Sequence, residues 1–487
     1  MRRALIVLLL PFYSACNSTD SGTIQILVGE ETDTFTQTPV PATIEVIAVD
    51  SSNNQTTLAT ASYPTSSIDL GLQSENTVAT LEVEALDATG HEVVFGSSIP
   101  VEYGALSGST LPIFVQRVGQ NARVPNPLAD ARQAPTVATI SGRFLVVAGG
   151  SDSTLSSTTN VYDFAQFDEL SGPPTLPRVP YSMPILELEG EDPIGLLIDP
   201  NGATYYDFAQ DQGNDTSPPD TTFAFGDVAG GQTIYDSTDS WVFVVGGTRT
   251  SGNPTAAVLW IDMTDTSNSS YPTGNLHWLS LSAQRLGASA AWVTNEGLVV
   301  GGGSASAPGV EMLHYPITAQ TTGAPLSFPP DSSVGSGMTW LAGTTMLMAG
   351  GVLASGLDAG VRQFDFTCAG TSCAPTVWSP LPRPLTLSSV FAINNPSQAF
   401  LVGSELASCS DPKCTPGLTH TYLLTTTGAN EVPTKVTHTN AVGYYSPVGS
   451  VLVVGGNDAG EFESFIPAPI TGYTPEPDAG TGDAASD

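Results

Sequence analysis

A short hydrophobic run that ends in glycine recurs along most of the chain, with a period of roughly 50 residues. Short apolar runs bounded by Gly, Pro, Asn and Asp indicate strands rather than helices. A period of about 50 residues is the length of one four-stranded propeller blade. The pattern therefore predicts an all-β fold with a β-propeller of seven blades, or six if the degenerate copy is not counted. The copies are Phe144–Gly150, Ile194–Ile198 (the degenerate one), Trp241–Gly247, Gly297–Gly303, Met346–Gly351, Phe400–Gly403 and Val451–Gly456.

Residues 285–328 illustrate one predicted blade. We expect its four strands at Arg285–Trp292 (the inner strand), Gly297–Gly303, Val310–Tyr315 and Pro325–Phe328 (the outer strand). An aromatic residue recurs after the glycine pair and is expected to pack between blades; its copies are Tyr162, Trp260, Tyr315 and Phe364.

The last copy has only three obvious strands, which end at Ile466. We expect residues near 117–124 to supply its missing outer strand, because a closed ring leaves no sheet edge unpaired.

The segments on either side of the repeats have different patterns. Residues 23–116 alternate apolar and polar positions, as half-buried strands do, which predicts a small immunoglobulin-like β-sandwich. Residues 117–131 then read as a linker and 132–470 as the propeller. Residues 471–487 are rich in Pro, Gly, Asp and Ala without apolar periodicity, which predicts a disordered acidic tail.

The N-terminus predicts export and a lipid anchor. Residues 1–15 have two arginines, a short apolar run and small residues before Cys16, an arrangement that resembles a bacterial lipobox. Residues 16–22 would then be a lipidated tether, and Asn17 favours the outer membrane or the cell surface. The alternative is ordinary cleavage after Ala15, which leaves Cys16 as a free thiol.

The other four cysteines form two closely spaced pairs, Cys368 with Cys373 and Cys409 with Cys414. Two local disulfides use all four thiols and leave only Cys16, in agreement with export to an oxidising compartment. The rival hypothesis is a zinc site of four thiolates, but such sites normally have two residues between paired cysteines rather than four. The disulfides are favoured.

The formal net charge of −34, from 47 acidic and 13 basic residues, restricts the partners. Such a surface repels nucleic-acid phosphates and anionic lipid headgroups. We therefore expect no nucleic-acid partner, and membrane contact only through the lipid anchor.

Although basic residues are scarce, an arginine recurs ahead of the inner strands. One hypothesis is that these arginines surround a mouth of the propeller channel and contact an anionic ligand such as an acidic glycan. The other is that each one bonds loop carbonyls or carboxylates of the adjacent blade. The spacing is seventeen residues from Arg132, Arg178 and Arg285 to Gly149, Gly195 and Gly302, and twenty from Arg383 and Lys435 to Gly403 and Gly455.

The hydrophobic run with its glycine pair, the later aromatic residue and the preceding arginine together resemble kelch repeats across residues 132–466. The resemblance implies a propeller. It also raises the hypothesis of a copper enzyme, since galactose oxidase is a kelch propeller with a copper site of tyrosines and histidines. The histidines of this chain do not have metal-ligand spacing, so no metal, cofactor or catalytic residue is assigned. They are His91, His277, His314, His420 and His438.

These observations lead to two functional hypotheses. The first is a monomeric, lipid-anchored cell-envelope protein whose propeller binds or scaffolds an envelope protein or glycan. The alternative is an extracytoplasmic carbohydrate-active enzyme with its site at the mouth of the channel. An enzyme should have converging polar or ionisable groups at one mouth, whereas a scaffold should have small and apolar inner strands there.

Overall fold

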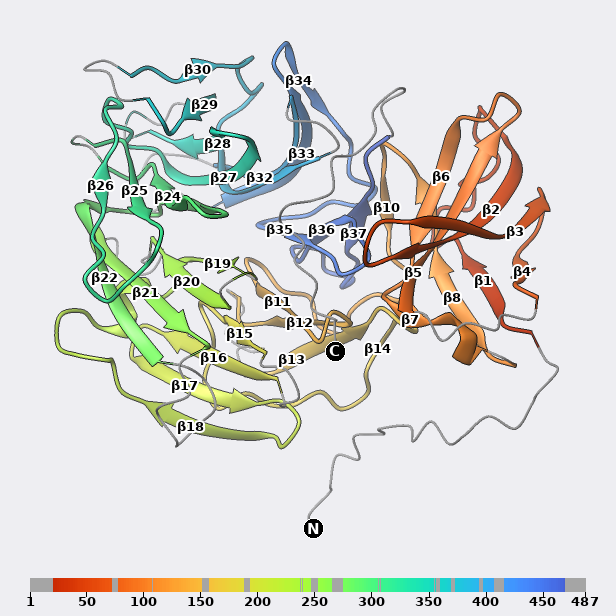
Figure 1. The fold of residues 1–487 in the computed structure, drawn as a ribbon, viewed down its shortest axis with the longest axis horizontal. Helices are drawn as coiled ribbons and strands as arrows, with labels where there is room; N and C mark the ends of the chain where they lie inside the picture. The colour runs from red at the N-terminus through yellow and green to blue at the C-terminus, as the bar shows by residue number, and fades with distance from the viewer. Residues whose placement is uncertain are drawn as a thin grey trace.

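The computed structural model shows a ring of β-sheets with a β-sandwich packed beside it (Figure 1). It describes residues 21–468 except 72–77, 107, 151–156, 188–192, 237, 239, 247–252, 265–274, 305, 307, 354, 356–359, 369–372, 394–396 and 407–415. Cys16, residues 16–20 of the predicted tether and the predicted acidic tail lie outside the described residues. Helix is confined, in the described part, to one turn of α-helix, α1 (Phe225–Val228), and one turn of 3-10 helix, η1 (Tyr103–Leu106).

The N-terminal unit is a sandwich of two sheets, as predicted. One sheet has the order β4-β1-β8, with β1 and β8 parallel, and the other has the order β3-β2-β5-β6-β9, with β7 beside β5. Alternate residues of the central strands, such as Ile44, Val46, Leu81 and Val83, are fully buried between the sheets. The strands are β1 (Thr23–Leu27), β2 (Pro41–Asp50), β3 (Gln55–Ser62), β4 (Ser67–Asp69), β5 (Val78–Asp87), β6 (Glu92–Ser97), β7 (Val101–Glu102), β8 (Thr110–Phe114) and β9 (Gln116–Arg117).

Seven sheets of four strands follow within the described residues, which confirms the seven-bladed propeller over the six-bladed alternative. Blades 1 to 6 use consecutive strands from the inner to the outer position. These are β11 (Thr136–Ile140), β12 (Phe144–Ala148), β13 (Thr159–Asp163) and β14 (Asp168–Glu169) in blade 1; β15 (Ile185–Leu186), β16 (Ile194–Asp199), β17 (Gly202–Asp207) and β18 (Gln212–Thr216) in blade 2; β19 (Gln232–Asp236), β20 (Trp241–Val245), β21 (Thr255–Asp262) and β22 (Asn275–Arg285) in blade 3; β23 (Ser289–Val293), β24 (Gly297–Gly301), β25 (Val310–His314) and β26 (Ala324–Pro325) in blade 4; β27 (Val334–Ala342), β28 (Thr345–Val352), β29 (Val361–Asp365) and β30 (Thr376–Val377) in blade 5; and β31 (Leu385–Ala392), β32 (Gln398–Leu406), β33 (Pro416–Thr425) and β34 (Gly428–Glu431) in blade 6.

Blade 7 is completed by a strand from the start of the ring. Its inner three strands are β35 (Val442–Tyr445), β36 (Val451–Val454) and β37 (Glu463–Phe465), and its outer strand is β10 (Asn121–Arg123). Asn121 pairs with Phe465 and Arg123 with Glu463, so the first and last strands of the propeller segment are hydrogen-bonded to each other. The segment read as a linker, residues 117–131, therefore contains a strand of the propeller.

The glycine pairs end the second strand of a blade in a conformation that other residues rarely adopt. Gly302 and Gly303 have φ angles of +74° and +70°. A Cβ atom on Gly303 would lie 2.6 Å from the carbonyl oxygen of Leu286, in the segment that leads to the inner strand. The pairs are therefore required where the second strand turns against the start of its own blade.

The recurring aromatic residues occupy the third strands, with one exception. Tyr162, Trp260 and Phe364 are buried, and they pack against residues of neighbouring blades or strands. Tyr315 lies just after β25 and is 36 % exposed, and Leu313 fills the buried position in that blade. The Tyr315 ring nevertheless lies 5.8 Å from the ring of Trp241 in blade 3, so the predicted packing between blades is confirmed at this position as well.

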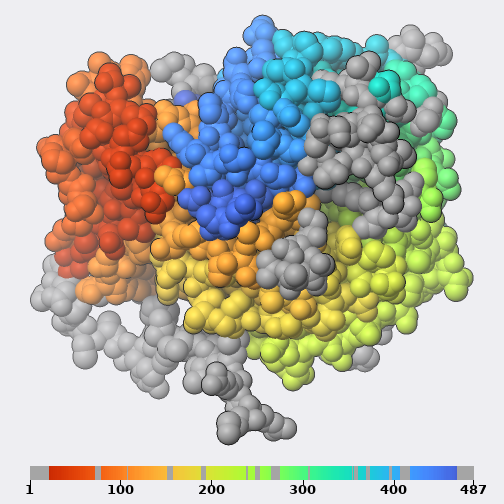
Figure 2. Space-filling model, turned by 180° about the vertical axis from the view of Figure 1, so that it is seen from behind, coloured from red at the N-terminus to blue at the C-terminus, as the bar shows by residue number. Residues whose placement is uncertain are grey.

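The sandwich is docked directly on blades 7 and 1 (Figure 2). Phe114 of β8 joins the apolar cluster that includes Tyr162 and Phe462, and its ring lies 6.0 Å from that of Phe167. Arg123 of β10 forms ion pairs with Glu31 of the sandwich at 2.8 Å and with Glu461 of the ring at 3.1 Å. The two units therefore share a core and a charged contact.

Candidate functional site

Arg285, at the end of β22, is completely buried, and its hydrogen-bond partners belong to blade 4. Its Nε donates to Glu311 at 2.8 Å, and its Nη1 donates to the carbonyl oxygens of Gly302 and Gly309 at 2.7 and 3.0 Å. Glu311, the second residue of β25, is also fully buried. Burial lowers the pKa of Arg285, and the charge of Glu311 opposes that shift. The guanidinium thus links the segment just before the inner strand β23 to the end of β24 through hydrogen bonds. Arg285 ends β22 and precedes the inner strand β23, whereas the sequence analysis placed it within the inner strand.

The other predicted arginines have the same kind of surroundings. Arg132 is 2 % exposed, and its Nε donates to Asn160 of β13 at 2.8 Å. Arg178 donates to Thr204 of β17 at 2.9 Å and to Asp199 at 2.8 Å. In each blade the partner on the third strand is a polar residue near the start of that strand.

Arg383 is less enclosed than the other three. It donates to Glu405 at 2.6 Å, lies 3.5 Å from Glu431, and is joined by His420. The hydrogen bond to Glu405 raises the pKa of Arg383, and the same bond lowers the pKa of Glu405. Side-chain exposure of about a third in both partners leaves this cluster within reach of solvent.

Blades 5 and 7 contain the same contact with different residue types. In blade 5 the arginine is on the third strand, where Arg362 forms an ion pair with Asp331 at 3.2 Å. In blade 7 the side chain of His438, in place of that of Lys435, contacts Gly455 O at 2.7 Å and Glu463 at 3.2 Å, while Lys435 donates its backbone N–H to Glu463. The contact recurs although its charges are exchanged, which favours the structural hypothesis for the arginines over direct contact with an anionic ligand.

The spacing that aligned Arg178 with Gly195 was misleading. Gly195 lies inside β16, opposite Ile185. The residue of blade 2 that Arg178 contacts at the end of β16 is Asp199. The degenerate blade exists, but its hairpin turn is Asp199–Gly202 instead of a glycine pair.

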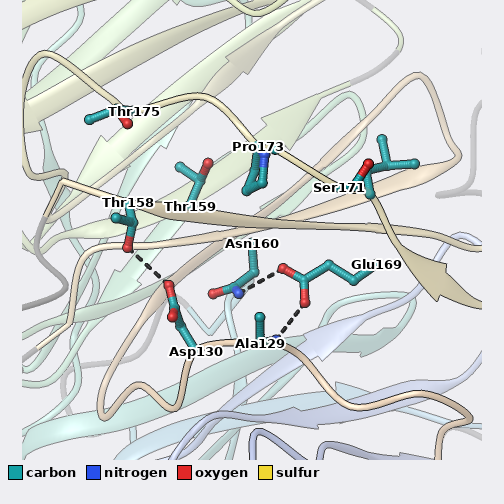
Figure 3. A pocket seen from close by; sticks show the side chains of 11 residues that line it. Ala129, Asp130, Thr158, Thr159, Asn160, Glu169, Ser171, Pro173 and Thr175 are labelled. Carbon is teal, nitrogen blue, oxygen red and sulfur yellow. Dashed lines mark hydrogen bonds between the residues drawn. The ribbon is translucent and has the colours of Figure 1, made fainter.

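A pocket of about 430 Å³ opens next to Arg132 on blade 1 (Figure 3). Three stretches of chain enclose it, namely 129–130 before β11, 158–160 at the start of β13, and 169–175 after β14. Seven of its eleven lining residues have polar side chains, among them Asp130, Thr158, Asn160 and Glu169. Arg132 was predicted as one of four possible ligand contacts, whereas the polar side chains that line this pocket were not predicted.

Hydrogen bonds hold the lining of the pocket in place. Asp130 accepts from Thr158 Oγ1 at 3.0 Å and from Arg132 Nη2 at 3.1 Å. Glu169 accepts from Asn160 Nδ2 at 2.8 Å and from the backbone N–H of Ala129. The Arg132 side chain itself is 1 % exposed. A molecule entering the pocket would therefore meet carboxylate and hydroxyl oxygens, while the cation lies behind them.

One of the two predicted disulfides is present. Cys368 and Cys373 are bonded, with an S–S distance of 2.03 Å. Cys409 and Cys414 lie outside the described residues, as does Cys16.

The described part of the chain has no cluster of metal-ligating residues and no helix of membrane-spanning length. No group of three or more His, Cys, Asp and Glu residues there could hold a metal ion. None of the helices there is long and apolar enough to cross a membrane.

No protein-family model matches this chain, and a comparison with curated proteins gave no match. Solved structures show partial similarity. A novel fungal alcohol oxidase of the AA5 family, in complex with copper, is 13 % identical, with 92 % of this chain and 94 % of that chain covered and a TM-score of 0.35. Oligopeptidase B from Leishmania major is 9 % identical, with 77 % of this chain and 51 % of that chain covered and a TM-score of 0.31. Similarity at this level carries no argument about the function of this chain.

Proposed function

We propose that this protein is a kelch-type, lipid-anchored binding protein of the cell envelope, and that the pocket on blade 1 receives a neutral glycan. The single observation behind the proposal is the pocket lining, where Asp130 and Glu169 are held in fixed positions by Arg132, Thr158 and Asn160. Fixed polar groups around a concavity are typical of a small-molecule site.

The charge distribution supports a neutral ligand over an acidic one. Sugar hydroxyls can donate to carboxylate oxygens, each of which can accept more than one hydrogen bond. An anionic sugar would meet the carboxylates of Asp130 and Glu169 without access to Arg132, whose side chain is 1 % exposed. The acidic-glycan hypothesis is therefore replaced by a neutral one.

Titration calorimetry with the purified full-length chain tests this proposal. The ligands are neutral oligosaccharides and, as charged counterparts, oligosaccharides of uronic acids. Ser171→Trp places a large ring on the lining of the pocket, and we expect it to weaken binding of the neutral ligand by about tenfold or more, a loss of at least about 1.4 kcal/mol.

The matched control is Val377→Trp. Val377 is 68 % exposed on the outer strand of blade 5, so this variant adds the same ring far from the pocket. Binding by Ser171→Trp that equals binding by Val377→Trp would overturn the assignment of the pocket. Release of new reducing ends from the bound glycan would favour the carbohydrate-active enzyme instead.

The lipid anchor has a separate test. Cys16→Ser should release the protein from the membrane fraction, since the chain would lose its acylation site. Continued membrane association of this variant would contradict the anchor but leave the pocket proposal intact.

A further inference from the structure

A second group of polar side chains gathers at the opposite end of the inner strands from the arginines. Tyr235 is in β19 of blade 3, Tyr444 is in β35 of blade 7, and Glu187 directly follows β15 of blade 2. Along blade 1, Arg132 precedes β11 and Ser141 follows it. Because Ser141 donates its backbone N–H to Glu187, this group lies at the far end of β11.

The inner strands β15, β19 and β35, which contain or directly precede these residues, lie around the centre of the ring (Figure 1). The Tyr235 hydroxyl accepts a hydrogen bond from the backbone N–H of Ile185 at 2.8 Å. Tyr444 and Glu187 both act electrostatically on the Tyr235 hydroxyl, and Glu187 acts on Tyr444 as well. Blades 3 and 7 are separated in the ring by blades 1 and 2, so these side chains approach one another across the ring centre.

The three side chains are enclosed by protein and yet accessible. Burial raises the pKa of Glu187, and it raises the pKa values of both tyrosines, so the phenols stay neutral. Tyr235 is nevertheless 46 % exposed, Glu187 is exposed and Tyr444 is half-buried. Enclosure together with accessible surface is the condition for a ligand site.

Glu187 differs from Glu311 in having no positive partner. Within the described residues, the hydrogen bond that Glu187 accepts comes from the backbone of Ser141, and no basic side chain forms an ion pair with it. Glu311, by contrast, is bound to Arg285. A carboxylate that is partly desolvated and left without a cation is costly, and such groups cluster at functional sites.

We propose that Glu187, Tyr235 and Tyr444 bind a protonated primary amine. An ammonium group has three N–H donors and no acceptor, and these residues offer one carboxylate and two phenol oxygens from three blades. Tyrosine rings also attract cations through their faces. The net charge of −34 draws cations to the molecule from a distance. This site is independent of the glycan proposal.

Calorimetry with the full-length protein in about 0.15 M salt, where exposed charges are screened beyond about 8 Å, provides the test. The probes are cadaverine, 1,5-pentanediol as its neutral counterpart of equal length, and Nα-acetyl-lysine methylamide. We expect the amines to bind and the diol not to bind. Stronger binding of the lysine derivative would assign a lysine side chain of a partner protein as the ligand, and stronger binding of cadaverine would assign a free polyamine. Equal binding of cadaverine and the diol, or no binding of either amine, would overturn the proposal.

Variants distinguish specific amine binding at Glu187, Tyr235 and Tyr444 from non-specific attraction of a cation to an acidic protein. Glu187→Gln keeps an acceptor for Ser141 and should weaken amine binding by about tenfold. Glu30→Gln, at an exposed position of the sandwich, removes the same charge and should leave binding unchanged. Tyr235→Phe should weaken binding several-fold and gives a second readout if Glu187→Gln folds poorly. An equal loss in Glu187→Gln and Glu30→Gln, or a full-strength complex with both Glu187→Gln and Tyr235→Phe, would refute the site.

Discussion

The two ends of the propeller ring use charged residues in opposite ways. At the end where the inner strands begin, Arg285 and Glu311 satisfy each other in full burial. At the end where the inner strands finish, Glu187 has accessible surface and, among the described residues, no cation beside it. The first arrangement recurs from blade to blade, whereas the second draws single residues from three different blades.

This difference distinguishes residues that stabilise the repeated fold from residues that are candidates for ligand binding. A contact that recurs in many blades has a structural role that every blade needs. It links the segment before the inner strand to the end of the second strand. The exchange of charges between Arg285–Glu311 and Arg362–Asp331 supports this view, because the fastening survives when the signs are reversed. A ligand contact would depend on the sign. Residues outside the repeat, such as Glu187, are better candidates for binding.

The largest expected effect is on stability at the arginine end. Arg285→Ala would leave Glu311 charged, buried and unpaired, and would also remove the donors to Gly302 and Gly309. Removing one partner of a buried pair costs about 3–5 kcal/mol. Chemical denaturation should show a loss of free energy of unfolding of that size.

The double variant Arg285→Met with Glu311→Leu is the control for this prediction. Replacement of both buried charges by apolar side chains should restore most of the loss, because no unpaired charge remains. A loss below about 1 kcal/mol in Arg285→Ala would mean that Arg285 does not fasten the blade and would reopen the ligand-contact hypothesis.

The sandwich provides a pH test of the same distinction between paired and unpaired carboxylates. Glu82 and Glu92 lie on β5 and β6 near Glu84. Burial, with a contribution from the neighbouring glutamates, raises the pKa of Glu82 to about 7 and that of Glu92 to about 8, from 4.5. The folded state therefore holds protons that the unfolded state has released between pH 4.5 and about 8.

The free energy of unfolding should consequently fall as pH rises through this window. This contribution is fully present below pH 4.5 and is lost as pH passes the folded pKa values of about 7 and 8. We expect a difference of at least about 2 kcal/mol between pH 5 and pH 8.5 in urea denaturation. Glu82→Gln with Glu92→Gln should flatten the profile, whereas Glu30→Gln with Glu102→Gln, at exposed positions, should not. Identical profiles for the two double variants would contradict the prediction.

A smaller effect is expected where the arginine contact is open to solvent. Arg383 and Glu405 each keep about a third of their side-chain surface exposed, so water screens the pair at 2.6 Å. Such pairs contribute about 0–1 kcal/mol. Arg383→Ala should therefore lower the free energy of unfolding by less than about 1 kcal/mol, and the loss should shrink in 1 M salt. A loss as large as that of Arg285→Ala would show that burial does not control the strength of these contacts.

Much of the fold could be predicted from local pattern. Apolar runs ending in glycine identified the second strand of most blades, since the turn that follows requires positive φ at residues such as Gly303. The closing strand could be inferred because blade 7 lacked an outer strand. Blade 2 was located correctly through a spacing to Gly195 that proved coincidental, because its hairpin turn has Asp199 instead of glycine.

The sites were harder to predict. A polar residue near the start of the third strand, such as Glu311 or Asn160, was a readable sign of the partners of the arginines. Glu187, Tyr235 and Tyr444 carry no such sign. They occupy non-equivalent positions in blades 2, 3 and 7, and only closure of the ring brings them together.

The smallest predicted effect has the opposite sign to the others. Glu187→Gln removes a partly desolvated carboxylate that lacks a cation, while the amide oxygen can still accept from Ser141. In the absence of amine, the variant should be as stable as the native chain or more stable, by up to about 0.5 kcal/mol. Thermal denaturation at pH 7, with Glu30→Gln to correct for the loss of one charge from an acidic surface, can resolve this change. The gain should disappear when cadaverine is added, because the native sequence binds the amine more tightly than the variant and is therefore stabilised more. A clear loss of stability in Glu187→Gln would mean that the carboxylate already has a stabilising partner, and the contrast between the two ends of the ring would fail.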